Sequence, residues 1–280
     1  MGTGLAGSLP GSIRNDTLGS VGDIPRLSNT AILDVVQAIS PVSAFTVAGA
    51  FSNAHFYDPS NTLLNSDQVT VQGGYSRLLN RHDQIGLIYA FQLFQFPQNT
   101  GGQVYNQIVN LRWSHTINGR LSLIAGAGPQ YTELEQGGYT KHWSVAARVQ
   151  LHYKLAHSSL VATYEKFTSS GSGFFAGANT QTARLGYNRP LGRTWEFFGD
   201  LAYSHNDRLQ SLGTFGVAAA TYDEGSALAV MRKHLGRTYD FFVSYRFSEI
   251  GFDSVGPSNL SRRQAGTIGV EWHPTPTRIE

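Results

Sequence analysis

The chain has 280 residues, of which 41% are hydrophobic and only 14% charged, with a net charge of +2 and no cysteine. The lack of cysteine excludes disulfides, a thiol nucleophile and a thiolate metal site, and the small net charge gives no support for nucleic-acid binding. No apolar run approaches the roughly 18 residues of a membrane-spanning helix, which excludes a helical membrane protein.

The first 41 residues are predicted to form an arm. Residues 1–27 are rich in Gly, Ser and Pro without periodicity, which is typical of a flexible segment. Ser28 offers an N-cap, and four apolar residues before Pro41 share one helical face, which predicts a short amphipathic helix at about 30–39: Ile32, Val35, Val36 and Ile39. Residues 1–30 show no signal-peptide pattern, so we expect a chain from which that peptide has been removed.

Residues 42–273 are interpreted as about twelve strands, and residues 141–155 show the pattern most clearly. Apolar residues such as Trp143, Val149 and Tyr153 occupy the odd positions, while His152 and Lys154 are among the polar residues at the even positions. This alternation is much longer than a typical strand of about 5–6 residues. It suits a strand that crosses the hydrocarbon of a bilayer at a tilt. The strand expected near residues 215–234 is the least clear.

The connections between the strands alternate between short turns and longer polar stretches. Asn118-Gly119 is a strong hairpin signal, because both residues tolerate positive φ. With an even number of strands, both termini are expected on the side of the short turns. In transmembrane β-barrels this is the periplasmic side. One hairpin motif occurs twice, since Leu191-Gly-Arg-Thr-Trp-Glu-Phe-Phe is repeated with conservative changes from Leu235.

Together these patterns resemble a bacterial outer-membrane β-barrel of the general porin-like class. The alternating Ile268, Val270 and Trp272 resemble the assembly signal in the last strand of such proteins, although residues 273–280 follow it here. The resemblance implies an all-β, transmembrane, antiparallel up-and-down barrel in the bacterial outer membrane. The expected organisation is an arm at 1–41, a barrel at 42–273 and a short periplasmic tail at 274–280.

The charged residues at inward positions are the candidate site. Those expected to line the lumen or a constriction are Arg112, Arg148, His152, Lys154, Glu165, Arg184, Glu196, Asp200, Asp240 and Arg246. They could pair into a network that fills a narrow barrel, or they could line a small aqueous channel. Three arginines on nearby strands (Arg112, Arg148 and Arg184) would suit carboxylated or phosphorylated sugars. An outward aromatic girdle is expected at Trp113, Trp143, Tyr153, Trp195, Tyr203, Tyr239 and Trp272.

The function predicted from these features is passive diffusion of hydrophilic solutes, with anions or saccharides as candidates. The alternatives are a barrel that translocates or exports a polysaccharide or protein, and a structural anchor; both would use residues 1–41 to hold a periplasmic or surface protein. The other expected partners are outer-membrane lipid and small solutes. No enzyme is expected, because His142 and Ser144 face the lumen and His115 has no outward serine nearby. No cofactor is expected, and no histidine or carboxylate cluster has metal-ligand spacing along the sequence.

Overall fold

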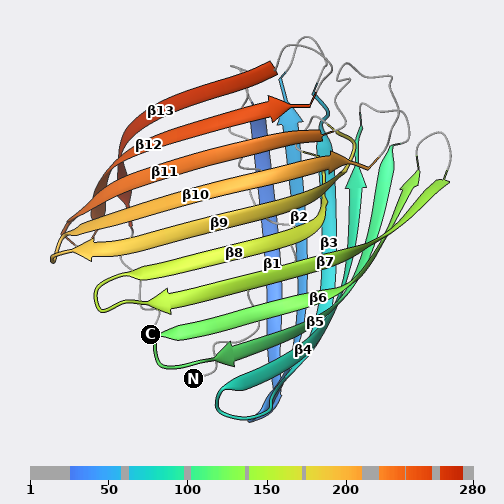
Figure 1. Ribbon diagram of the computed structural model, residues 1–280, viewed down its shortest axis with the longest axis horizontal. Helices are drawn as coiled ribbons and strands as arrows, with labels where there is room; N and C mark the ends of the chain where they lie inside the picture. Colours follow the sequence, from blue (N-terminus) through green and yellow to red (C-terminus); the bar gives the residue numbers. More distant parts are fainter. Residues whose placement is uncertain are drawn as a thin grey trace, which may run out of the picture.

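The computed structural model describes residues 26–57, 63–97, 102–135, 139–171, 175–209, 221–236, 238–253 and 259–273. These residues form a single thirteen-stranded sheet in which each strand pairs with the next along the chain, always antiparallel (Figure 1). In this part of the chain no helix is long and apolar enough to span a membrane. The strands are β1 (Arg26–Ser40), β2 (Ser43–Phe56), β3 (Ser66–Leu78), β4 (Asp83–Gln95), β5 (Gln103–Thr116), β6 (Leu121–Glu135), β7 (Tyr139–Lys154), β8 (Ser159–Ser169), β9 (Ala178–Leu191), β10 (Trp195–Arg208), β11 (Thr221–Leu235), β12 (Tyr239–Phe252) and β13 (Asn259–Trp272).

The two faces of the sheet differ in chemistry and in burial. In β5, Val109, Leu111 and Trp113 are exposed on one face, whereas Asn110 and Arg112 are buried on the other. The same division continues across the ladders, because residues paired across neighbouring strands lie on the same face. We call the face that carries Leu111 the outer face and the face that carries Arg112 the inner face. The inner side chains are more buried because the curvature of the sheet brings them together on its inside.

The predicted all-β, up-and-down arrangement is confirmed, and the twelve expected strands correspond to β2 through β13. Short turns at one edge of the sheet, the turn edge, alternate with connections at the other, the loop edge, which are longer except between β6 and β7. The strand that was hard to recognise is β11. Its outer face carries small residues (Gly225, Ala227 and Ala229), while Leu228 and Val230 lie on the inner face, which weakens the usual alternation.

The predicted helix at residues 30–39 is wrong, because this segment is strand β1. Val35 pairs with Val47 of β2, and Gln37 pairs with Phe45. The β-branched residues Ile32, Val35, Val36 and Ile39 lose side-chain freedom in a helix and are favoured in strands. Their spacing fits a helical stripe as well as a strand, and the neighbouring strand β2 decides between the two. Of the flexible segment predicted at residues 1–27, residues 26 and 27 belong to β1, and residues 1–25 lie outside the described residues.

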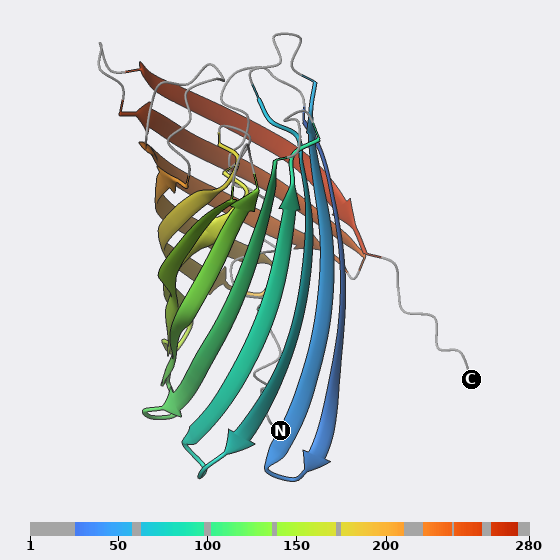
Figure 2. The same cartoon turned by 90° about the vertical axis from the view of Figure 1, so that its right-hand side faces the viewer.

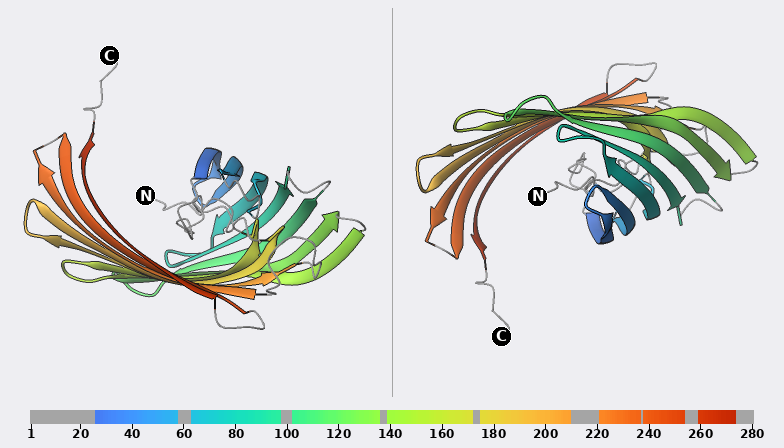
Figure 3. Two further views of the ribbon diagram at one scale, coloured as in Figure 1. Left: turned by 90° about the horizontal axis from the view of Figure 1, so that it is seen from above. Right: turned by 90° about the horizontal axis from the view of Figure 1, so that it is seen from below.

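The described sheet has two unpaired edges, β1 and β13. Figure 3 shows these strands on opposite sides of an opening in a trough-shaped sheet, and Figure 2 shows the strong twist between its two halves. With thirteen strands, β1 starts at the loop edge and β13 finishes at the turn edge. The expectation that both termini share one side concerns residues 1–25 and 274–280, which are not described. Backbone groups on both edges need partners in hydrocarbon, where water cannot satisfy them.

One seam of the sheet is only partly closed. The ladder between β7 and β8 stops at Ala147 and Lys166, so residues 139–146 of β7 extend beyond it (Figure 1). Past that point β8 turns inward, and Thr168 reaches Gln130 on the inner face of β6. Phe175, just before β9, packs with Ala178, Tyr222 and Ile250 on the inner face near the loop edge.

Gly128 is expected to be intolerant of any side chain. A Cβ atom at this position would lie 1.8 Å from the carbonyl oxygen of Val109 on β5, whereas a Cβ at Gly225 would meet nothing within 4 Å. Gly128→Ala should therefore destabilise the folded protein by about 1–3 kcal/mol, as overpacking typically does. Urea unfolding in detergent micelles measures the effect. The matched variant Gly225→Ala should change stability by less than about 0.5 kcal/mol, and equal effects would contradict the close approach of β5 and β6.

Candidate functional site: the charged inner face

A row of charged residues crosses the middle of the inner face. In the register of the sheet, Arg112 of β5 is followed by Gly126 of β6, Arg148 of β7 and Glu165 of β8. Arg148 Nε lies 3.1 Å from Glu165 Oε1, and the Glu165 side chain is only 4% exposed. Gly126 leaves space for the Arg112 side chain, because a Cβ there would lie 3.0 Å from Arg112 Cγ and 2.7 Å from Asn110 Oδ1. This row brings together three of the predicted lumen residues.

A small cavity of about 30 Å³ adjoins this row. Asn110, Arg112, Arg148 and Glu165 line one part of it, and Ile88, Ile124 and Phe167 are among its apolar lining residues. The Asn110 Oδ1 atom is buried without a hydrogen-bond partner. A cavity of about this size holds one water molecule when polar groups surround it. The central row is thus a packed ionic cluster with room for water.

Arg184 of β9 lies in the row adjacent to Arg148, displaced toward the turn edge. Its Nε atom is 2.6 Å from Asp200 Oδ2 on β10, so this pair is a close hydrogen-bonded ion pair. The predicted ladder of arginines is present in space, but Arg148 and Arg184 each have a carboxylate partner. A solute anion would have to compete with these carboxylates for the guanidinium groups.

Near the loop edge the inner face carries tightly packed side chains that the sequence analysis missed. The amide Nδ2 of Asn106 donates to Gln92 Oε1 at 2.6 Å, and Thr132 Oγ1 donates to Asn106 Oδ1 at 3.1 Å. All three side chains are 0–1% exposed. Above them lies an apolar cluster formed by Leu64, Phe94, Phe96, Val104 and Leu134, with Ala176 and Leu209 packed against it. No sequence signal identified this cluster, because it depends on the inward turn of β8.

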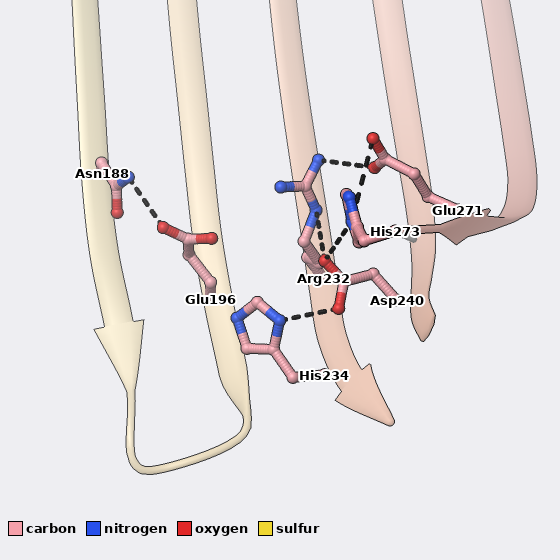
Figure 4. A network of polar contacts seen from close by, with 7 residues as sticks. All are labelled: Asn188, Glu196, Arg232, His234, Asp240, Glu271 and His273. Atoms are coloured by element: carbon pink, nitrogen blue, oxygen red, sulfur yellow. Dashed lines mark hydrogen bonds and ion pairs between the residues drawn. The ribbon is translucent and has the colours of Figure 1, made fainter. Parts of the chain in front are cut away.

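A second ionic cluster occupies the turn edge, where β11, β12 and β13 meet (Figure 4). Asp240 is its centre, with His234 Nδ1 2.8 Å from Oδ1 and His273 Nε2 3.3 Å from Oδ2. Arg232 Nη2 lies 3.3 Å from Glu271 Oε2. The sequence analysis placed the acidic residues Asp240 and Glu271 on the lumen side, but it did not bring them together with His234 and His273. The hairpin register, which pairs His234 with Asp240 and Asp240 with Glu271, assembles the rest.

The other predicted lumen residues also lie on the inner face. Glu196 accepts a hydrogen bond of 2.8 Å from Asn188 Nδ2 (Figure 4). His152 and Lys154 follow Arg148 along β7 toward the turn edge. Arg246 of β12 is exposed, and within the described residues it has no ion pair or hydrogen bond from its side chain.

The predicted girdle residues all lie on the outer face. Five of them are near the turn edge, where Tyr239 pairs directly with Trp272: Trp113, Tyr153, Trp195, Tyr239 and Trp272. Trp143 and Tyr203 lie toward the loop edge, and Trp143 packs on Tyr131 with ring centroids 5.0 Å apart. Lys233 lies over the Trp195 ring at 5.2 Å, a cation–π contact suited to a membrane interface.

No known protein-family model and no curated protein sequence matches this chain. Solved structures do match. The FrpB iron transporter from Neisseria meningitidis (F5-1 variant) aligns over 83% of this chain and 46% of its own, with 10% identity and a TM-score of 0.53. The ferric citrate transporter FecA aligns over 88% of this chain and 47% of its own, with 12% identity and a TM-score of 0.53. The chain has the fold of a bacterial outer-membrane β-barrel protein.

This outer-membrane barrel fold spans about half the length of the solved structures it matches. At such low identity the likeness concerns the fold alone. It agrees with an outer face that is apolar between aromatic residues and an inner face that is charged and amide-rich. Chemically, the inner face can hold water and ions, and it can exchange its internal ion pairs for contacts with a polar solute.

Proposed function

We propose that this protein provides a passage across the bacterial outer membrane for small hydrophilic solutes, with a modest preference for anions. One observation carries the proposal: the inner face holds rows of charged and amide side chains, while the outer face at the same level is apolar. A passage also requires that the β1 and β13 edges be paired in the membrane, since open edges are not tolerated in hydrocarbon.

The fold neighbours support transport as the general role. Two proteins with matching folds are described as an iron transporter and a ferric citrate transporter. Because the match covers less than half of each of those chains, their cargo is not transferred to this one. The proposal rests on the inner face of this chain, whose charges are of both signs and therefore favour weak selectivity.

The exposed Arg246 is the best-placed cation for selecting a passing anion. Arg148 and Arg184 are held by Glu165 and Asp200, whereas the Arg246 side chain has no such partner among the described residues. The proposed passage thus uses the paired arginines to shape a constriction and Arg246 to attract anions.

Conductance in planar bilayers tests the passage. The purified full chain should form steady channels with a small anion preference, read from the reversal potential in a salt gradient. Arg246→Gln should reduce that preference, while Arg189→Gln, an equal charge change on the outer face, should leave it unchanged. An absence of conductance, or an equal shift in both variants, would overturn the proposal.

The alternative of an export or anchoring barrel loses one of its supports, because the helix assigned to it is strand β1. Any truncation that tests the arm must therefore stop before Arg26, since a longer deletion removes a strand from the sheet. Deleting residues 1–25 should leave the conductance intact if the chain is a passive passage. Loss of a co-purifying envelope protein, with no channel in either form, would favour the anchor.

A further inference from the structure

The cluster at the turn edge has the donors of a metal site. The Asp240, Glu271 and His273 side chains each offer one ligand atom, and these three atoms lie within 4.8 Å of one another. His273 Nε2 is 3.3 Å from Asp240 Oδ2 and 3.9 Å from Glu271 Oε1. A tetrahedral zinc ion bound at about 2.1 Å separates its ligand atoms by about 3.4 Å. The three donors are therefore close to the spacing that such an ion requires.

The backbone holds these donors in place. Asp240 and Glu271 are directly paired across β12 and β13, so their side chains leave the sheet on the same face. His273 follows β13, and its backbone N–H donates to the carbonyl of Thr238 at 2.7 Å. The Asp240 side chain is only 9% exposed. Two strands with fixed register thus aim three ligand groups at one point on the inner face.

The surrounding groups complete the site without occupying it. Arg232 Nη2 contacts Glu271 Oε2, which leaves Oε1 directed at His273. His234 Nδ1 contacts Asp240 Oδ1, while Oδ2 lies 3.3 Å from His273 Nε2 and 3.9 Å from Arg232 Nε. Such contacts to the second oxygen of a ligating carboxylate orient it and tune metal affinity. A divalent ion would balance the two carboxylates, and Arg232 would remain as a neighbouring cation.

The duplicated hairpin provides an internal comparison. Glu196 occupies the same position in its hairpin as Asp240 does in the second, 44 residues later. Its cross-strand neighbours are Pro190 and Arg232, whereas Asp240 has His234 and Glu271. The same backbone motif therefore carries metal donors in one copy and none beside the acid in the other. The donor set is a property of the second hairpin and its neighbour β13, not of the hairpin motif.

We propose that Asp240, Glu271 and His273 bind a divalent first-row transition metal such as Zn²⁺, with His234 supporting the Asp240 carboxylate through its other oxygen. Nitrogen and carboxylate donors in this mixture favour zinc and its neighbours over calcium or magnesium, which prefer oxygen ligands alone. On binding, the metal takes the place of the direct contact between His273 Nε2 and Asp240 Oδ2. The ion then links β12 to β13 at the turn edge, next to the β13 edge of the sheet.

Calorimetric titration of the full chain in detergent micelles with Zn²⁺ alone tests this site, using protein without a polyhistidine tag. One saturable site per chain is expected. His273→Ala and Glu271→Gln should each weaken binding by about 10–100-fold or more, on the scale of losses at metal sites. Glu196→Gln, the equivalent residue of the first hairpin, should bind as the unaltered protein does.

Cobalt keeps the test decisive if a variant folds poorly. Co²⁺ bound by the unaltered protein should show the intense visible absorption of a tetrahedral site, and Zn²⁺ should displace it. Mg²⁺ should neither bind nor compete. The proposal is overturned if the unaltered protein has no saturable Zn²⁺ site, or if folded His273→Ala binds with unchanged affinity. Neither result depends on whether the protein conducts.

Discussion

Replacing Glu165 with alanine is expected to lower the free energy of unfolding by about 3–5 kcal/mol, because it leaves buried guanidinium charge without its carboxylate. The Glu165 side chain is 4% exposed, and Arg148 lies 3.1 Å from it on the neighbouring strand. Arg112, in the same row, is also buried. Urea unfolding of the protein in micelles, followed by tryptophan fluorescence, measures the loss.

Two further variants separate burial from simple loss of an ion pair. Glu249 forms an ion pair near the surface, with its Oε2 atom 2.6 Å from Arg262 Nε. Glu249→Gln should lower the free energy of unfolding by no more than about 1 kcal/mol. Arg148→Met combined with Glu165→Leu should recover most of the lost stability, since apolar replacements of a buried pair are often neutral or better. A small effect for Glu165→Ala would show that water reaches the central row freely.

Placing an arginine at Leu111 should destabilise the protein in a bilayer by about 2–4 kcal/mol, the cost of a cation at the midplane of a barrel wall. Leu111 is 62% exposed in the middle of the outer face of β5, so a new charge there would point away from the described part of the sheet. Reversible unfolding in lipid vesicles measures this cost.

Ile117 supplies the matched control for depth. It lies on the same side of the chain just beyond the turn edge of β5, and it is 48% exposed. Ile117→Arg should cost only about 0–1 kcal/mol, because a cation near the interface keeps its contact with water. Equal costs at the two positions would mean that the outer face of β5 does not cross hydrocarbon.

The strands were predictable because each one carries its own signal. Strict alternation in β7 and the Asn118-Gly119 turn depend only on neighbouring residues, and they gave the faces of the sheet correctly. The β1 segment was misassigned because Ile32, Val35, Val36 and Ile39 fit a helical stripe and a strand equally. Pairing with β2 resolves that ambiguity, and pairing is not visible in a single segment.

The candidate site was predictable only in part, because its contacts are between strands. The alternation of side chains along each strand was enough to place Arg148 and Glu165 on the inner face. Only the register between β7 and β8 shows that the two residues are paired. The metal-ligand cluster has no spacing signal, since Asp240 and Glu271 are far apart in sequence. The tight connection after His234 was a usable clue, because a short hairpin fixes His234 opposite Asp240. The contact between Thr168 and Gln130 near the loop edge follows from the departure of β8 from β7. No local sequence pattern indicates that departure.

The central claim is that the outer face of the sheet meets lipid while the inner face meets water. The chain has no cysteine, so single cysteines can be introduced along β7 without background. In lipid vesicles, a membrane-impermeant thiol reagent should react rapidly with Gln150→Cys and His152→Cys, and slowly with Val149→Cys and Leu151→Cys. Equal reactivity on both faces, or faster reaction at positions 149 and 151, would contradict the account.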